Sequence, residues 1–236
     1  MRLSAPVFQL KRKAKLMARR HGVTLNEALD QIAREEGFPR WSALSAALSG
    51  GTASLPLLSE LSCGDLLLLA GRPGQGKTKL GLQLLLDAVR EGRQAFLFTL
   101  DFTASQAKKH LQTLDASGGS LAESVQIFTS DQISAEYIVQ HMSGQRPGTI
   151  AVIDFLQLLE QQRSKPALSA QLETLSAFAR GAGVILGFMS QIDRSYLASD
   201  KEFPGMEDVR LPNHADLSHF TKACFLQDGK AHFQAV

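Results

Sequence analysis

The chain has 236 residues, of which 44% are hydrophobic and 20% charged, and its net charge is +2. This length suits one sizeable α/β domain with a small appendage, and the apolar content is sufficient for a core. The longest apolar runs, at residues 66–70 and 184–189, are far too short to span a bilayer, which excludes a membrane protein. The two cysteines match no metal-ligand spacing and follow no signal-peptide pattern, so we expect no disulfide and a cytoplasmic location.

The net charge conceals a basic amino-terminal segment. Residues 1–50 hold nine Lys or Arg against four Asp or Glu, which leaves sixteen against nineteen in the remainder. Residues 6–20 combine apolar positions at helical spacing with six basic residues and no acidic one, which predicts a basic amphipathic helix. Its basic face suits nucleic-acid phosphates or an acidic partner surface, but a solvated face on a docking helix explains the same pattern.

Two further helices complete a predicted helical head over residues 1–50. Thr24 and Glu27 form a capping-box pattern at the start of the second helix, and Gly37 is placed to end it. A third, short helix is expected over residues 42–48. Residues 51–58 are rich in Gly, Ser, Thr, Ala and Pro, which predicts a linker to a second domain at residues 59–236.

The second domain begins with a phosphate-binding loop pattern. The segment Gly71-Arg72-Pro73-Gly74-Gln75-Gly76-Lys77-Thr78 fits G-x-x-x-x-G-K-[ST] and follows an apolar run. Such a loop lets successive backbone N–H groups converge on phosphate oxygens at the start of a helix. Lys77 is expected to reach the β- and γ-phosphates and Thr78 to ligate Mg²⁺, so the pattern predicts a site for ATP with Mg²⁺. A glycine-rich turn without a ligand does not explain Lys and Thr at these offsets.

The rest of the domain alternates between apolar runs and helical patterns. This alternation indicates an α/β, RecA-like fold with a mostly parallel sheet and helices on both faces, whose ligands sit at the carboxyl ends of the strands. Strands are predicted at residues 66–70, 95–100, 125–128, 149–153, 184–189 and 223–226, and helices at residues 77–90, 105–114, 134–142 and 168–180.

Polar residues that follow three of these strands are candidate catalytic and metal-binding groups. Asp154 is placed to hold Mg²⁺ directly or through water. Asp101 could orient and deprotonate the attacking water, but it equally suits the N-terminal cap of the next helix. Gln191 could contact the γ-phosphate and transmit its loss to a moving loop, and a plain hydrogen-bonding role at the strand end is the alternative.

These motifs, in this order, resemble the motor domain of DnaB-type replicative DNA helicases, which belong to the RecA-like P-loop ATPase superfamily. The resemblance covers roughly residues 60–226 and rests on residues 71–78, 98–101, 152–159, 190–195 and 208–210. Residues 154–158 read Asp-Phe-Leu-Gln-Leu, where the family typically reads Asp-Tyr-Leu-Gln-Leu. The resemblance implies a RecA-like fold, Mg-ATP hydrolysis and a ring that grips single-stranded DNA.

The chain departs from the family in three places. The family has Glu at the position of Asp101, its amino-terminal helical domain differs from the basic head, and its basic hairpin that reaches a neighbouring subunit's nucleotide has no counterpart after residues 223–226. We therefore predict a Mg-ATP-binding and hydrolysing ATPase that acts on DNA or is regulated by it, and a monomer or weak oligomer in solution. A nucleotide-controlled interaction module without helicase activity is the alternative. A RecA-like kinase is less favoured because nothing marks a phosphoacceptor pocket.

Overall fold

A computed structural model of the chain describes residues 4, 7–44, 57–115, 117–160, 165–198, 201–211, 213 and 215–236. The chain divides into two compact units. The first comprises Met1–Leu55 with Gln227–Lys230, and the second comprises Pro56–Leu226 with Ala231–Val236. Most of the predicted linker at residues 51–58, and most of the predicted third helix at residues 42–48, lie outside the described residues.

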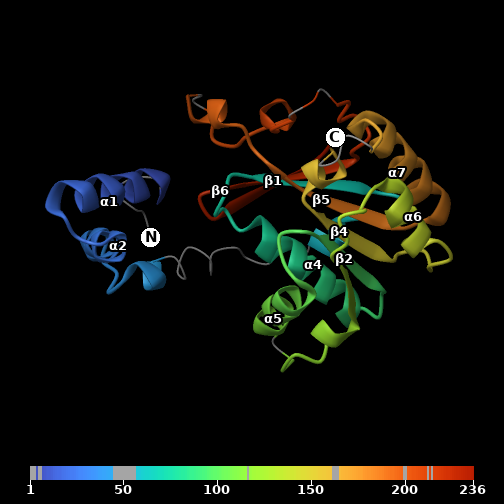
Figure 1. The fold of residues 1–236 in the computed structure, drawn as a ribbon, viewed down its shortest axis with the longest axis horizontal. Helices are drawn as coiled ribbons and strands as arrows, with labels where there is room; N and C mark the ends of the chain where they lie inside the picture. Colours follow the sequence, from blue (N-terminus) through green and yellow to red (C-terminus); the bar gives the residue numbers. More distant parts are fainter. Residues whose placement is uncertain are drawn as a thin grey trace. The chain divides into compact units, whose positions relative to one another are not determined.

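The first unit contains two helices packed against each other, α1 (Val7–His21) and α2 (Leu25–Glu35) (Figure 1). Their contact buries apolar side chains at helical spacing, namely Leu10, Ala14, Ala28 and Ile32. The predicted capping box is present, because Thr24 Oγ1 accepts from Glu27 N at 3.2 Å and Glu27 Oε2 accepts from Thr24 N at 2.9 Å. Gly37 has a φ of +84° just after the end of α2, as its predicted role requires.

The second unit is built on a seven-stranded sheet with strand order β3-β2-β4-β5-β1-β6-β7. The strands are β1 (Leu66–Gly71), β2 (Ala95–Thr99), β3 (Val125–Phe128), β4 (Ile150–Asp154), β5 (Ile185–Gln191), β6 (Lys222–Gln227) and β7 (Lys230–Ala235). The pairs from β3 through to β6 are all parallel, which confirms the predicted mostly parallel α/β sheet. Strand β7 was not predicted. It follows β6 after a tight turn at Asp228 and Gly229, both of which have positive φ.

Helices cover both faces of this sheet (Figure 1). They are α4 (Lys77–Arg90), α5 (Ala104–Leu114), α6 (Ala135–Met142) and α7 (Leu168–Ala182). Alternate residues of β1 enter different cores: Leu67 and Leu69 pack with α4 and α5, whereas Leu66 and Leu68 pack with α6 and α7. Short 3₁₀ helices lie at η1 (Leu57–Glu60), η2 (Ala122–Ser124), η3 (Leu156–Glu160), η4 (Arg194–Ala198) and η5 (Met206–Asp208). Within the described ranges, every helix is too short or too polar to cross a membrane.

Helix α4 approaches the sheet closely at Gly81. A Cβ atom at this position would lie 2.3 Å from Met189 Cε of β5 and 3.2 Å from Val152 Cγ1 of β4. Because both distances are shorter than ordinary van der Waals contact, any larger residue would force its neighbours to move. The glycine thus sets the spacing between α4 and the two strands that carry candidate site residues.

Candidate functional site

The loop between β1 and α4 has the backbone conformation that its glycines allow. Gly74 and Gly76 have φ of +80° and +93°, in the left-handed region that disfavours side chains. A Cβ atom on Gly71 would lie 3.0 Å from the carbonyl oxygen of Leu226 in β6, so β1 and β6 are close where the loop begins. Gly76 occupies the N-cap of α4 and offers no side-chain cap. The first-turn N–H groups of α4 therefore lack the side-chain acceptor that usually satisfies them, which suits an anionic ligand.

Lys77, the first residue of α4, folds back across the loop. Its Nζ donates to the carbonyl oxygen of Arg72 at 3.1 Å. Burial lowers the pKa of Lys77, while the charges of Asp154 and Asp101 act in the opposite direction. The predicted cation therefore lies within electrostatic range of both predicted carboxylates. Thr78, the next residue, is partly buried in the first turn of α4.

Asp154 is the last residue of β4 and is 5% exposed. Its pKa is raised to about 6, first by burial and then by the charge of Asp101, whereas Lys77 lowers it. In the sheet, Asp154 is level with Thr99 of β2 on one side and Met189 of β5 on the other. A buried carboxylate whose charge is unfavourable fits a divalent cation, because the cation stabilises the ionised form.

Asp101 is exposed just beyond the end of β2, and its N–H donates to Thr99 Oγ1 at 3.1 Å. The interpretation of Asp101 as a helix cap is wrong. The N-cap of α5 is Thr103, whose Oγ1 accepts from Gln106 N at 3.3 Å, while Gln106 Oε1 accepts from Thr103 N at 2.9 Å. This capping box leaves the Asp101 carboxylate available at the same end of the sheet as Lys77 and Asp154.

Gln191 ends β5 in register with Gly71, the residue that begins the phosphate-loop pattern. Its Oε1 accepts from Arg210 Nη1 at 3.4 Å, and its carbonyl oxygen accepts from Arg210 N at 2.8 Å. Gln157, in η3, donates from Nε2 to the carbonyl oxygen of Arg210 at 2.6 Å and to Ser190 Oγ at 3.2 Å. Sequence reasoning did not select Gln157 or Arg210 as site residues. Both lie in segments that carry the family resemblance, but their contact joins positions that are distant along the chain.

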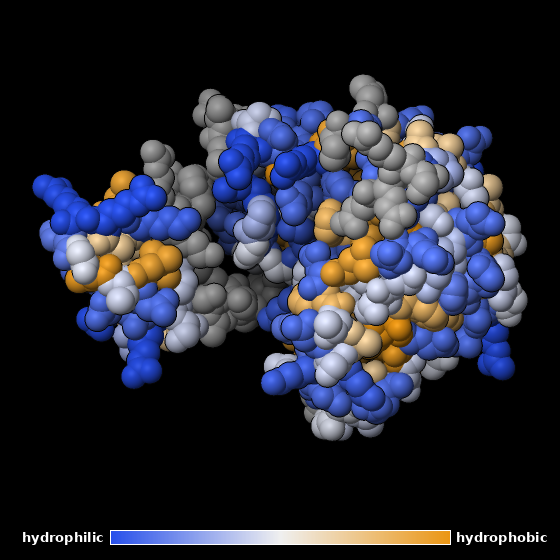
Figure 2. Space-filling model, in the orientation of Figure 1, coloured by the Kyte–Doolittle hydropathy of each residue, from blue (hydrophilic) through white to orange (hydrophobic). Residues whose placement is uncertain are grey.

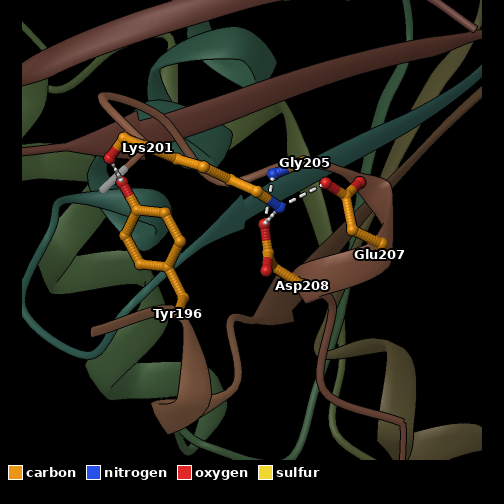
Figure 3. Close-up of polar contacts among 5 residues, drawn as sticks. All are labelled: Tyr196, Lys201, Gly205, Glu207 and Asp208. Carbon is orange, nitrogen blue, oxygen red and sulfur yellow. Dashed lines mark hydrogen bonds and ion pairs between the residues drawn. The ribbon is translucent and has the colours of Figure 1, made fainter. Parts of the chain in front are cut away.

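The loop that follows Gln191 closes on itself. Residues 193–208 leave the sheet and return where Asp193 N donates to the carbonyl oxygen of Asp208 at 2.8 Å. Figure 3 shows Lys201 between the carboxylates of Glu207 and Asp208, with a 3.1 Å contact to Asp208 Oδ2. The Tyr196 hydroxyl donates to the carbonyl oxygen of Lys201 at 2.9 Å. Gln191 is thus joined, through Arg210, to a loop with a defined set of internal contacts.

Solved structures with a similar fold include ATPase domains of the DnaB-like helicase class. One such ATPase domain has a TM-score of 0.57 and 20% identity, covering 70% of this chain and 69% of that one. A DnaB-like replicative helicase, whose structure describes its interactions with primase, has a TM-score of 0.59 and 17% identity, covering 97% of this chain and 74% of that one. No family model matches the chain, and no curated protein matches it.

These likenesses confirm the RecA-like architecture that the motif order predicts. At 20% identity or less they concern the fold, and they bear on the helicase class only in general terms. The mostly parallel sheet, the helices on both faces and the loop between β1 and α4 agree with that class. The chain therefore has the fold of the RecA-like ATPase domain of DnaB-type helicases.

Proposed function

We propose that the protein binds ATP with Mg²⁺ and hydrolyses it in a reaction that acts on DNA or is regulated by it. The observation that carries this proposal is the gathering of Lys77, Asp154 and Asp101 beside the glycine loop at residues 71–78. Each of these residues affects the others' charge, although they come from three separate elements. A cation, a buried carboxylate and an exposed carboxylate beside an open helix N-terminus are the groups that phosphoryl transfer requires.

The residues take distinct roles in this proposal. The backbone of the loop, from Gly71 to Thr78, cradles the phosphates, and Lys77 supplies the cation that neutralises them. Thr78 and Asp154 hold Mg²⁺, which when bound offsets negative charge on the phosphates. Asp101 orients and deprotonates the attacking water. Gln191 contacts the terminal phosphate and passes its presence or loss to residues 193–208 through Arg210.

The nucleotide assignment is tested by Lys77→Ala with isothermal titration calorimetry. A hydrogen bond to a charged group contributes roughly 1.5–3 kcal/mol, so we expect ATP affinity to fall by at least about tenfold. Lys79→Ala is the matched control, because Lys79 is an exposed lysine two positions further along α4. Equal ATP affinity in the parent and in Lys77→Ala would overturn the assignment of the loop.

The DNA component of the proposal is tested by steady-state ATP hydrolysis with and without single-stranded DNA. The fold class supports a DNA-linked ATPase, and we expect DNA to increase the hydrolysis rate. The alternative, a nucleotide-controlled interaction module, is favoured by the shorter, exposed Asp101. Tight ATP binding with negligible turnover under both conditions would favour that module and contradict the DNA-linked ATPase.

A further inference from the structure

The outer face of α1 carries positive charge that nothing in the described part of the chain neutralises. Lys13 Nζ pairs with Glu35 Oε2 of α2 at 2.6 Å. Lys15, Arg19 and Arg20 are exposed and make no ion pair with any described residue. Lys15 and Arg19 are one helical turn apart, so their side chains lie on the same side of α1.

The acidic residues of the first unit are used to hold the unit together. Glu27 belongs to the capping box of α2, and Asp30 Oδ1 accepts from Trp41 N at 2.8 Å. Glu35 pairs with Lys13, and Glu36 Oε2 accepts from Ser4 N at 2.8 Å. These four are all the acidic residues among residues 1–50. The positive charge on α1 is therefore left for a partner outside this unit.

The apolar face of α1 is already occupied, which argues against insertion into a membrane. Leu10 and Ala14 are buried against α2, and the large exposed apolar side chain on α1 among the described ones is Leu16, at 58%. Helices that lie in a membrane interface bury a continuous apolar face there. Protein interfaces also centre on aromatic or aliphatic anchors and are depleted in lysine. In Figure 2, strongly hydrophilic side chains gather on the side of the first unit where Figure 1 places α1.

We propose that α1 binds the phosphates of duplex DNA without reading its sequence. An α-helix with side chains is about 10–12 Å wide and B-DNA has a major groove of about 12 Å, whereas the deep, narrow major groove of A-form RNA excludes side chains. Single-stranded nucleic acid is usually held by stacking on aromatic rings. Among the described side chains of this unit, the aromatic ring of Trp41 packs against the core instead. The proposal is independent of nucleotide binding at residues 71–78.

The test uses the full chain, a duplex of mixed sequence about two turns long and fluorescence anisotropy at salt concentrations from about 50 to 200 mM. The variant Lys15→Gln/Arg19→Gln/Arg20→Gln removes three charges from α1. Because each phosphate contact contributes about 0.9 to the slope of log affinity against log salt, we expect a slope shallower by about 2.7. At low salt we expect affinity to fall by more than about tenfold. Far-UV ellipticity equal to the parent's shows that the helices are retained.

The matched control removes three charges from the second unit. Arg90→Gln/Arg93→Gln/Lys108→Gln changes basic residues that pair with Asp87, Glu91 and Glu123, and it should keep the parent's slope. An unchanged slope in the α1 variant, equal losses in both variants, or a parent that binds only single strands would each overturn the proposal. Lys77→Ala should keep the parent's slope while the α1 variant keeps the parent's ATP affinity, so failure of this proposal is distinct from failure of the nucleotide assignment.

Discussion

Asp154 must be charged to hold a cation, yet its position in the protein disfavours that charge. Its pKa is raised to about 6 from an ordinary value of 3.8, with burial as the largest cause. The folded protein therefore binds this proton more tightly than the unfolded chain does. As a result, this group makes the nucleotide-free protein less stable as the pH rises from about 4 to about 6.

The same shift predicts the pH dependence of ATP hydrolysis. Below about pH 6 the carboxyl is protonated and cannot act as a ligand, so we expect the hydrolysis rate to rise with pH through that value. Raising the Mg²⁺ concentration should move the midpoint to lower pH, because the cation and the proton compete for the same oxygen atoms. Initial rates at two Mg²⁺ concentrations measure this. A midpoint that does not respond to Mg²⁺ would assign the titration to another group.

Asp101 is predicted to act in the transition state and not in ATP binding. The Asp side chain is shorter than that of the family's Glu by one methylene, on the order of 1 Å, and a misplacement of that size can cost about a hundredfold in rate. We therefore expect slow hydrolysis by the parent and a still lower single-turnover rate for Asp101→Asn, at unchanged ATP affinity.

Thr103→Ala separates this catalytic role from helix capping. Because Thr103 caps α5, its loss should reduce the free energy of unfolding by about 1 kcal/mol while leaving the hydrolysis rate near the parent's. If Asp101→Asn hydrolyses ATP at the parent's rate in single-turnover measurements, Asp101 is not the base.

At the scale of elements, the close contact of β1 with β6 can be tested with a pair of glycines. A methyl group added at Gly71 meets the backbone oxygen of Leu226, which cannot rotate away. We expect Gly71→Ala to lower the free energy of unfolding by about 1–3 kcal/mol and to weaken ATP binding. Gly181→Ala in α7 is the control, because an added Cβ there has no atom within 4 Å and alanine favours helices by about 1 kcal/mol. Urea denaturation that ranks the two variants the other way would contradict this account.

The predictable elements were those with a continuous apolar run or a strong amphipathic period. Helix α4 and strand β3 begin and end at the predicted residues, and the other predicted strands and helices of the second unit agree within about two. Strand β7 was missed because Lys230–Ala235 lacks an apolar run and is only partly buried. The pair Asp228-Gly229, which is typical of a two-residue hairpin turn, was the available signal.

The candidate site was predictable only as far as strand ends are. Parallel strands end at one edge of a sheet, so residues after β2, β4 and β5 could be expected near the loop that follows β1. The contact of Gln157 with Arg210 spans 53 residues and depends on how η3 and the returning loop pack, which local patterns do not encode. The cap at Thr103 was locally encoded, because Thr103 and Gln106 have capping-box spacing, but the carboxylate of Asp101 drew the interpretation two residues too early.

At the scale of the whole molecule, the surface predicts the state of assembly. The large apolar side chains exposed among the described residues are few and scattered: Leu16, Val23, Leu25 and Val236. Stable oligomers usually bury a contiguous apolar patch, so we expect a monomer or weak oligomer without nucleotide, and any ring to depend on ATP or DNA. Sedimentation velocity with and without Mg-ATP measures this. A stable hexamer in the absence of nucleotide would contradict it.

The packing of Trp41 in the first unit gives the protein an intrinsic optical reporter. Trp41 is the chain's single tryptophan and lies against the small core formed by α1 and α2. Its emission therefore reports the environment of that unit, whereas far-UV ellipticity is dominated by the longer second unit. Titrations with urea or DNA can thus follow the first unit at one wavelength, without attaching a dye or cutting the chain.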